Sequence, residues 1–307
     1  MTGGARPRLL RDADPVVRVL YGVLAGPLTA GDVAALAPRD WDRLVLAAER
    51  EKATIVLARA LAPHVAAAGA PVPVGATTLA RLALVTEFRM LQLEARLEQS
   101  VAALRAAGIP CLLLKGAALA ATYYGSCTAR PMLDIDLVVP RDAVGRAYRT
   151  LVADAGWRET RSAAVDDPGA LALHHCPPLR DASGVEVNCE VHAELLAPGQ
   201  SFTLDAAAVW AEARPLDGRL AGAWVPSATH LVLHACIHFA WQHMMRSASW
   251  RTFRDIATVT QARFDWDAFV VEARDAKAAT ACWWTLRLGE GLAGLAVPRD
   301  VMRALAP

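Results

Sequence analysis

The chain has 307 residues, of which 54% are hydrophobic and 21% charged, and its formal net charge is +1. This composition is typical of a globular protein of about two domains, and it excludes an extensively disordered chain. The near-neutral charge offers no general attraction for nucleic acid, and no apolar run reaches the ~18 residues of a membrane-spanning helix. We therefore expect a cytoplasmic protein without a signal peptide, whose cysteines stay reduced.

The N-terminal part of the chain is predicted to be helical. The pattern predicts helices over Pro15–Leu24, Pro38–Leu61 and Thr77–Ala107, and in the last of these apolar residues recur three or four positions apart. The glycine at Gly108 ends this helix. We therefore assign residues 1–108 to an N-terminal helical region.

A different pattern begins after this glycine. Ile109–Leu114 has the length and apolar character of a short core strand, and the residues from Ala117 to Tyr124 follow a helical pattern. The turn between them contains Lys115 and Gly116. A glycine at the start of a helix lets the backbone approach a ligand, and the free N–H groups there favour a phosphate. The segment is therefore a candidate phosphate site, with the Lys115 charge beside it.

The next predicted strand, Met132–Val139, contains two carboxylates. Because side chains alternate faces along a strand, Asp134 and Asp136 project from one face and Ile135 from the other. Two carboxylates on one face are poor core residues and good ligands for a divalent cation. We therefore expect a metal site here, with Mg²⁺ or Mn²⁺ as the ion.

A third carboxylate is predicted on a later strand. The residues from Glu186 to His192 alternate strictly between polar and apolar, which is typical of a half-buried strand with a polar face. Glu190 could lie next to Asp134 and Asp136 if the two strands are neighbours in one sheet. Glu186 is the competing candidate for the third acid.

The C-terminal part of the chain is again helical in pattern. Its first predicted helix follows Ser227 and runs to Trp241, with His230, His234 and His238 on one face. Three histidines in such a row can bind zinc, but no carboxylate or cysteine partner is fixed by spacing, which favours buried, hydrogen-bonded histidines. The regions that we predict are residues 1–108, 109–225 and 226–307.

These motifs together resemble the nucleotidyltransferase superfamily of the DNA polymerase β type, in particular a bacterial branch of uncharacterised nucleotidyltransferases. The resemblance covers about residues 80 to 290. The matching positions are Lys115-Gly116, Tyr124-Gly125, Arg130-Pro131, Asp134, Asp136 and Glu190-Val191-His192.

The resemblance implies an α+β fold, with a small mixed sheet and helices as the core and helical regions before and after it. It also implies that Asp134, Asp136 and Glu190 bind the metal and are catalytic, with His192 as an accessory group. A nucleoside triphosphate such as ATP would be the co-substrate. Its phosphates would contact residues of the Gly turn and a nearby arginine, namely Lys115, Gly116, Ala117 and Arg130.

The implied reaction is metal-dependent transfer of a nucleoside monophosphate to a hydroxyl or amine, with release of pyrophosphate. The acceptor would be a small molecule, a peptide or a protein, and we rank nucleic acid last because of the net charge. The wider superfamily usually has Gly-Ser or Gly-Gly where this chain has Gly116-Ala117. This difference favours an alternative, a weakly active or inactive nucleotide- or partner-binding module. A metal-dependent phosphohydrolase is a third hypothesis.

Overall fold

The computed structural model describes residues 7–69, 71–160, 175–261 and 263–307. The chain divides into two compact units, Phe88–Leu231 and the combination of Met1–Glu87 with Val232–Pro307. The boundaries fall inside two helices, α5 (Val74–Ala106) and α9 (Ala228–Trp241). The three-part division made from the sequence stays a prediction.

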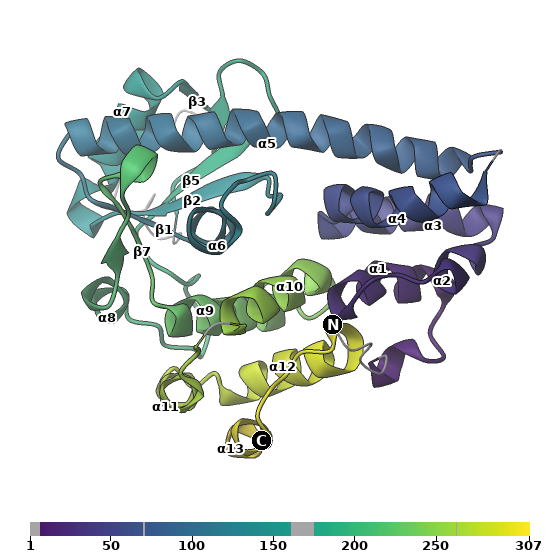
Figure 1. Cartoon of the computed structure of the whole chain (residues 1–307). Coiled ribbons are helices and arrows are strands. Elements are labelled where there is room, and N and C mark those ends of the chain that lie inside the picture. Colours follow the sequence, from purple (N-terminus) through teal and green to yellow (C-terminus); the bar gives the residue numbers. More distant parts are fainter. Residues whose placement is uncertain (1–6, 70, 161–174, 262) are drawn as a thin grey trace. The chain divides into compact units, whose positions relative to one another are not determined.

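The unit Phe88–Leu231 is built on a seven-stranded sheet with the strand order β3-β4-β5-β2-β1-β7-β6 (Figure 1). Its strands are β1 (Cys111–Leu113), β2 (Asp134–Val138), β3 (Trp157–Glu159), β4 (Leu179–Asp181), β5 (Asn188–His192), β6 (Arg214–Pro215) and β7 (Ala223–Val225). The sheet is mixed, because β2 runs parallel to β5 and antiparallel to β1. With helical regions before and after it in the sequence, it confirms the predicted α+β class.

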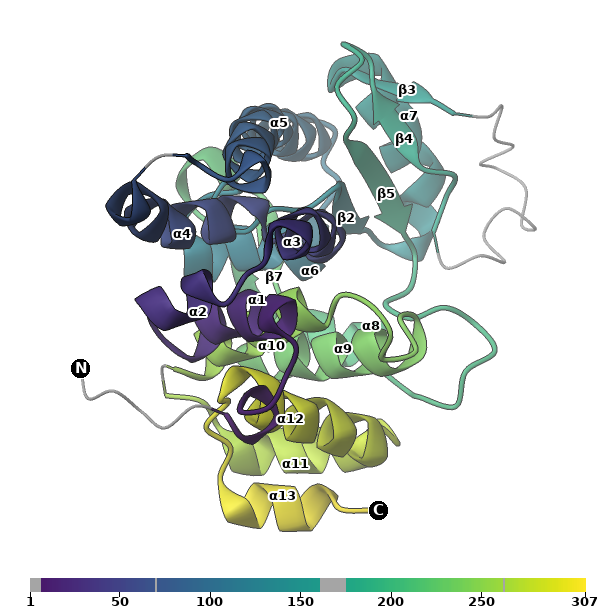
Figure 2. The ribbon, with the colours of Figure 1, turned by 90° about the vertical axis from the view of Figure 1, so that its right-hand side faces the viewer.

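Helices cover one face of this sheet. The Trp157 Nε1 donates to Ser100 Oγ of α5 at 2.8 Å, and Arg96 of α5 pairs with Asp181 of β4. A second helix, α7 (Val144–Asp154), packs against β3 and β5 (Figure 2). Since side chains alternate along each strand, the residues next to Trp157 and Asp181 project from the opposite face.

The connection from β1 to β2 is helical. It consists of α6 (Lys115–Leu119) and the π-helical segment η2 (Ala120–Tyr124), and the chain then returns to the sheet through Arg130 and Met132. The predicted helix Ala117–Tyr124 therefore starts two residues earlier than expected. This places Lys115 at the first position of α6, directly after the buried strand β1.

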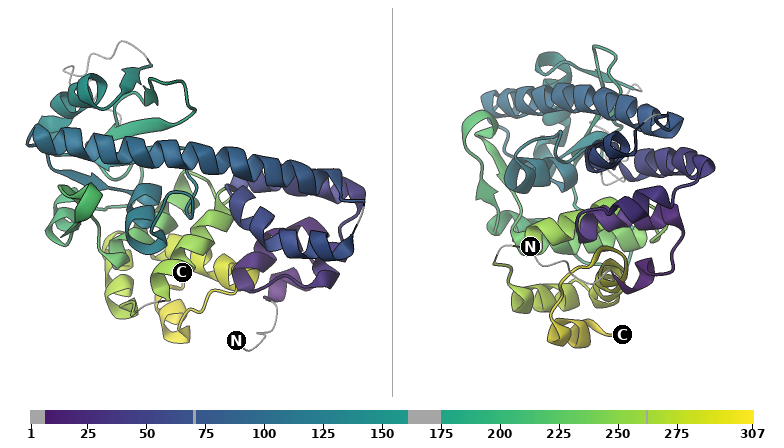
Figure 3. Two further views of the ribbon diagram at one scale, coloured as in Figure 1. Left: turned by 45° about the horizontal axis from the view of Figure 1, so that its top comes forward. Right: turned by 45° about the vertical axis from the view of Figure 1, so that its right-hand side comes forward.

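The other unit is helical and is assembled from both ends of the chain. Purple N-terminal and yellow C-terminal helices lie side by side in Figure 3. Trp250 of the C-terminal segment is bonded to the N-terminal segment twice. Its Nε1 donates to Leu20 O at 2.6 Å, and its backbone N–H donates to Glu51 Oε2 at 3.1 Å. The helices are α1 (Pro15–Ala25), α2 (Ala30–Ala34), α3 (Pro38–Glu51), α4 (Thr54–Ala68), α10 (Ser249–Thr260), α11 (Trp266–Asp275), α12 (Ala279–Ala293) and α13 (Arg299–Leu305).

Two sequence predictions need correction. The helix predicted over Pro38–Leu61 is interrupted, because Lys52 adopts a left-handed conformation with φ of 59° and divides it into α3 and α4. No strand is predicted from the sequence over residues 215–225, but this segment contains β7 and the end of β6. These strands are too short to produce a periodic pattern in the sequence.

The six cysteines are all buried and unpaired, as expected for reduced thiols. Within the described ranges, none of the helices combines the length and the apolar character of a membrane-spanning segment.

Candidate active site

The candidate site is built on the parallel pair β2 and β5. Their register places Asp134 opposite Asn188, Asp136 opposite Glu190, and Val138 opposite His192. Residues that are directly opposite in a sheet project from the same face, so Asp136 and Glu190 come together as the alternation in each strand predicts. The competing acid Glu186 precedes β5, is 78% exposed and pairs with Arg89 at 2.9 Å.

Asp136 is the centre of this site, and its side chain is 1% exposed. Its Oδ1 accepts hydrogen bonds from Lys115 Nζ at 2.6 Å and from His192 Nε2 at 2.9 Å. The same His192 nitrogen lies 3.5 Å from Glu190 Oε2. Four side chains from β2, β5 and the start of α6 therefore form one cluster.

The electrostatics of the cluster keep both acids ionised. Burial works to raise the pKa of Asp136, but the Lys115 charge and the His192 hydrogen bond outweigh it and hold that pKa below its usual range. The hydrogen bond from His192 lowers the pKa of Glu190 in spite of burial. Burial works to lower the pKa of His192, whereas its bonds to Asp136 and Glu190 raise it overall.

This donor set suits a divalent cation. Asp136, Glu190 and His192 each offer one ligand atom, and these atoms all lie within 4.8 Å of one another. Carboxylate and imidazole donors together are ligands that Mn²⁺ accepts, and the carboxylates alone suit Mg²⁺. Asp134 lies two residues before Asp136 on β2, is partly exposed, and its charge acts on Lys115. Its role as a metal ligand stays a prediction.

The turn after β1 approaches the site closely. Lys115 has a φ of 48°, and a Cβ at Gly116 would lie 2.8 Å from Met132 Sδ and 3.1 Å from Met132 Cβ. A larger residue here would force the Met132 side chain to move, so glycine favours the close packing of α6 against the segment leading into β2. Arg130 is buried in the same place, and its Nη1 donates to Pro131 O at 2.9 Å. Ala117 is also buried, so any phosphate contact by its backbone stays a prediction.

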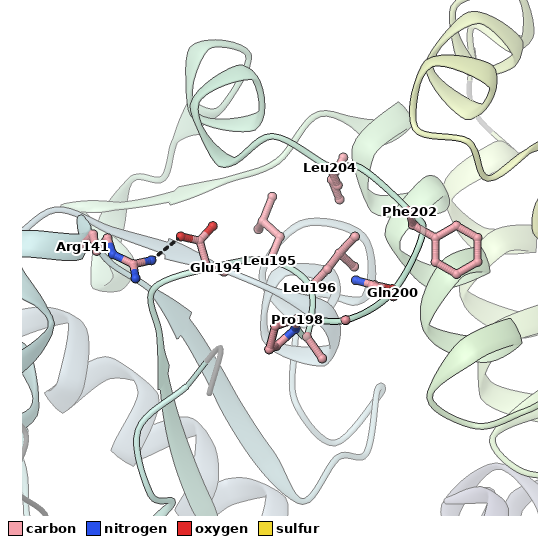
Figure 4. Close-up of a pocket in the computed structure, with 10 residues that line it drawn as sticks. Arg141, Glu194, Leu195, Leu196, Pro198, Gln200, Phe202 and Leu204 are labelled. Carbon is pink, nitrogen blue, oxygen red and sulfur yellow. Dashed lines mark hydrogen bonds and ion pairs between the residues drawn. The ribbon is translucent and has the colours of Figure 1, made fainter. Parts of the chain in front are cut away.

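Two cavities lie near the ends of β5. One, of about 350 Å³, follows its C-terminal end and has leucines, Pro198 and Phe202 in its wall, with the Arg141–Glu194 ion pair of 2.7 Å at its edge (Figure 4). The other, of about 680 Å³, lies on the side of β3 and β4 and contains Arg158, Arg180 and Asn188. These two arginines were not predicted from the sequence as site residues, because only the register of the strands shows that they share a face with the acids.

The histidines of α9 make contacts of their own. His230 is buried and its Nδ1 lies 2.9 Å from Ser227 Oγ, as expected for a hydrogen-bonded core histidine. The rings of His234 and His238 stack with their centroids 5.8 Å apart.

A comparison with known protein families concerns most of the chain. The family model described as uncharacterised nucleotidyltransferase matches residues 37–294, which includes the sheet, the turn at Lys115 and every residue of the cluster. A search among curated proteins found no match. Membership of such a family implies a nucleoside triphosphate as a substrate. Because the match extends over most of the length of the chain, the chain belongs to the uncharacterised nucleotidyltransferase family.

Proposed function

We propose that this protein transfers a nucleoside monophosphate from a nucleoside triphosphate to a hydroxyl or amine of a small molecule, a peptide or a protein, and releases pyrophosphate. The observation that carries the proposal is the position of Asp136 directly opposite Glu190 on parallel strands, with ligand atoms clustered within 4.8 Å. Phosphoryl transfer depends on positioning and electrostatics, which a rigid pair of neighbouring strands supplies.

Asp136 and Glu190, with Asp134 beside them, would hold Mg²⁺ or Mn²⁺. A divalent cation bound there supplies charge neutralisation for the phosphates and lowers the pKa of an attacking hydroxyl. His192 would orient Asp136 through its hydrogen bond, as groups behind metal ligands commonly do. Glu190, the more exposed of the paired acids, is in a position to accept a proton from the acceptor.

The nucleotide would lie on the β1 side of the carboxylates. Lys115 contacts Asp136 through a flexible side chain that can also reach a phosphate, and Arg130 adds a second positive charge beside Gly116. The backbone at Gly116 and Ala117 completes the predicted phosphate contacts. These cations would offset the charge of the triphosphate as pyrophosphate leaves.

A specific observation favours the alternative of a weakly active or inactive binding module. Lys115 and His192 already compensate the charge of Asp136, so the buried acid does not require a metal for its stability. The place of the usual serine is taken by Ala117, which has no hydroxyl for the triphosphate. Such a module would bind nucleotide or partner without turnover.

The test is a panel of the four nucleoside triphosphates with Mg²⁺ or Mn²⁺, assayed for thermal stabilisation alone and for pyrophosphate release with small hydroxyl and amine compounds and peptides as acceptors. We expect metal-dependent stabilisation by at least one nucleotide, and Asp136→Asn or Asp136→Ala should reduce transfer at least ~100-fold with the fold intact. The control is Asp142→Asn, an exposed carboxylate in the same unit. Undiminished transfer by the Asp136 variants would refute the assignment. Stabilisation without turnover would indicate the binding module, and release of inorganic phosphate would indicate a phosphohydrolase.

A further inference from the structure

Four residues form a row across β3, β4, β5 and β2. Arg158 is opposite Arg180, Arg180 is opposite Asn188, and Asn188 is opposite Asp134. Directly opposite residues project from the same face, so the two arginines share the face of the site carboxylates. The residues next to the arginines along each strand support this, because Trp157 and Asp181 contact α5 on the other face.

The arginine pair is unusual for a sheet. Like charges directly opposite one another destabilise strand pairing. Both arginines are exposed, and neither guanidinium forms an ion pair or a hydrogen bond with another described residue. Two adjacent guanidinium groups present a set of donors that matches a phosphate or a carboxylate. An anion bound between them would remove their repulsion.

The pair lines a cavity that adjoins the site. The wall of this cavity, of about 680 Å³, contains Arg158, Arg180, Asn188 and His175, and Glu159 is its one carboxylate among the described residues. His175 forms a β-bridge with His192, and the two rings lie 5.2 Å apart. The cavity therefore extends from the arginine pair to His175, the neighbour of the His192 side chain that contacts Asp136.

The order of the strands decides which substrate this cavity serves. The turn with Lys115 and Gly116 follows β1, on one side of β2, whereas β5, β4 and β3 follow one another on the other side. The nucleotide contacts in the proposed function all belong to the β1 side. The cavity lies across the carboxylates from them, which is where an acceptor would approach.

We propose that Arg158 and Arg180 bind an anionic group of the acceptor, a phosphate or a carboxylate, while its hydroxyl or amine lies at Asp136 and Glu190. This inference rests on the proposed function. Arg180 is two strands from β2, a Cα separation of about 10 Å, so the anionic group and the reacting atom belong to one compact acceptor or to adjacent groups of a peptide.

The experiment uses phenyl phosphate and benzoate as probes, titrated by calorimetry into the full chain with and without a saturating nucleotide and Mn²⁺. We expect phenyl phosphate to bind more tightly than benzoate because it carries the larger charge, and to bind at least about tenfold more weakly to Arg158→Ala/Arg180→Ala. Added salt should weaken binding. The matched control is Arg146→Ala, an exposed arginine of α7, which should bind like the wild type.

The nucleotide panel, repeated on the same variants, separates the possible failures. Nucleotide-dependent stabilisation should persist in the double arginine variant and disappear in Asp136→Asn. If the double arginine variant also loses nucleotide-dependent stabilisation, the arginine pair holds the triphosphate and the inference is wrong. Competition between phenyl phosphate and the nucleotide would lead to the same conclusion. Probe binding that is absent in the wild type, or equal in the double variant, also overturns it and leaves the proposed function intact. If no nucleotide stabilises the wild type, the proposed function fails, and with it the assignment to an acceptor.

Discussion

At the scale of single residues, Asp136 shows how an acid can be buried in a strand whose other buried residues are apolar. Removing a carboxylate from water is costly unless charged or polar partners compensate for it. Here an ammonium and an imidazole both contact its Oδ1. A compensated acid of this kind stays ionised, which is the state that the proposed metal site requires.

The contact between Lys115 and Asp136 gives a first prediction. Lys115→Met should lower the free energy of unfolding by about 1–3 kcal/mol in EDTA, because Asp136 loses a charged partner in a buried site. Mn²⁺ should reduce this loss, since a bound cation replaces the missing ammonium. The measurement is urea unfolding in EDTA and in Mn²⁺.

Lys277→Met is the matched control for this prediction. Lys277 is exposed and has a similar φ of 56°, but among the described residues no carboxylate contacts it. It should change stability by less than about 0.5 kcal/mol in either buffer. An equal loss for Lys115→Met with and without Mn²⁺ would show that the lysine has only a structural role.

Alternation along the strands was enough to predict that Asp134 and Asp136 share a face and that Glu190 belongs to a polar one. The partner of Lys115 was not predictable, because it depends on how α6 leaves the sheet. The packing reason for Gly116 depends on Met132, sixteen positions later in the chain. Such contacts follow from tertiary approach, which a single sequence does not encode as a pattern.

At the scale of elements, the β3–β4 hairpin is fixed to α5 by buried polar contacts. Arg96 and Ser183 both contact the Asp181 carboxylate, whose side chain is 2% exposed. Burial works to raise the pKa of Asp181, but the hydrogen bonds from Ser183 and Arg96 lower it overall. The hairpin that carries the arginine pair is therefore held by an ionised acid on its other face.

This lowered pKa predicts a pH dependence. A depressed folded-state pKa contributes stability above the unfolded value of about 4, and this contribution is lost as the pH falls through the folded value. Asp181→Asn should therefore lower the free energy of unfolding by about 1–3 kcal/mol at neutral pH, with a smaller difference from wild type in acid. Urea unfolding of the wild type and Asp181→Asn, from neutral to acid pH, measures this difference in the free energy of unfolding.

The comparison variant is Glu194→Gln, which breaks the exposed Arg141–Glu194 pair. Exposed pairs contribute little, so we expect a change below about 1 kcal/mol at any pH. A difference between Asp181→Asn and wild type that stays constant from neutral to acid pH would contradict the role given to the ionised carboxylate.

Long elements were predicted more accurately than short ones. The helix predicted over Thr77–Ala107 is present as Val74–Ala106, because many turns repeat the same apolar spacing. β6 and β7, with two and three residues, were missed. The interruption at Lys52 was missed as well, because neither glycine nor proline marks it.

At the scale of the whole molecule, one compact unit is formed from segments at both ends of the chain. The core that joins them includes Leu20 and Leu44 from the N-terminal segment and Phe239, Trp250 and Phe253 from the C-terminal segment. Periodicity identifies each helix but not its partner, so this pairing was not predictable from the sequence.

Trp250 gives a prediction at this scale. Trp250→Ala should destabilise its own unit by about 3–5 kcal/mol, because it removes a buried ring and the donor to Leu20. Hydrogen exchange should become faster in α1 and α10 and remain slow in β2 and β5, whose unit has a separate core.

Trp284→Ala controls for the loss of a tryptophan, since that side chain belongs to the same unit and is 45% exposed. We expect a change below about 1 kcal/mol from it. Equal acceleration of exchange in β2, β5 and α10 on Trp250→Ala would mean that the chain unfolds as one cooperative body.

The strand order of the sheet has a consequence for how this family can diversify. The acids proposed to bind the metal lie on β2 and β5, whereas the arginine pair lies on the β3–β4 hairpin at the edge of the sheet. Substitutions on an edge hairpin leave the pairing of the inner strands unchanged. If the acceptor is recognised at the edge and the transfer takes place inside, as proposed, descendants of one ancestor can acquire new acceptors by changing a few exposed side chains while inheriting the same reaction.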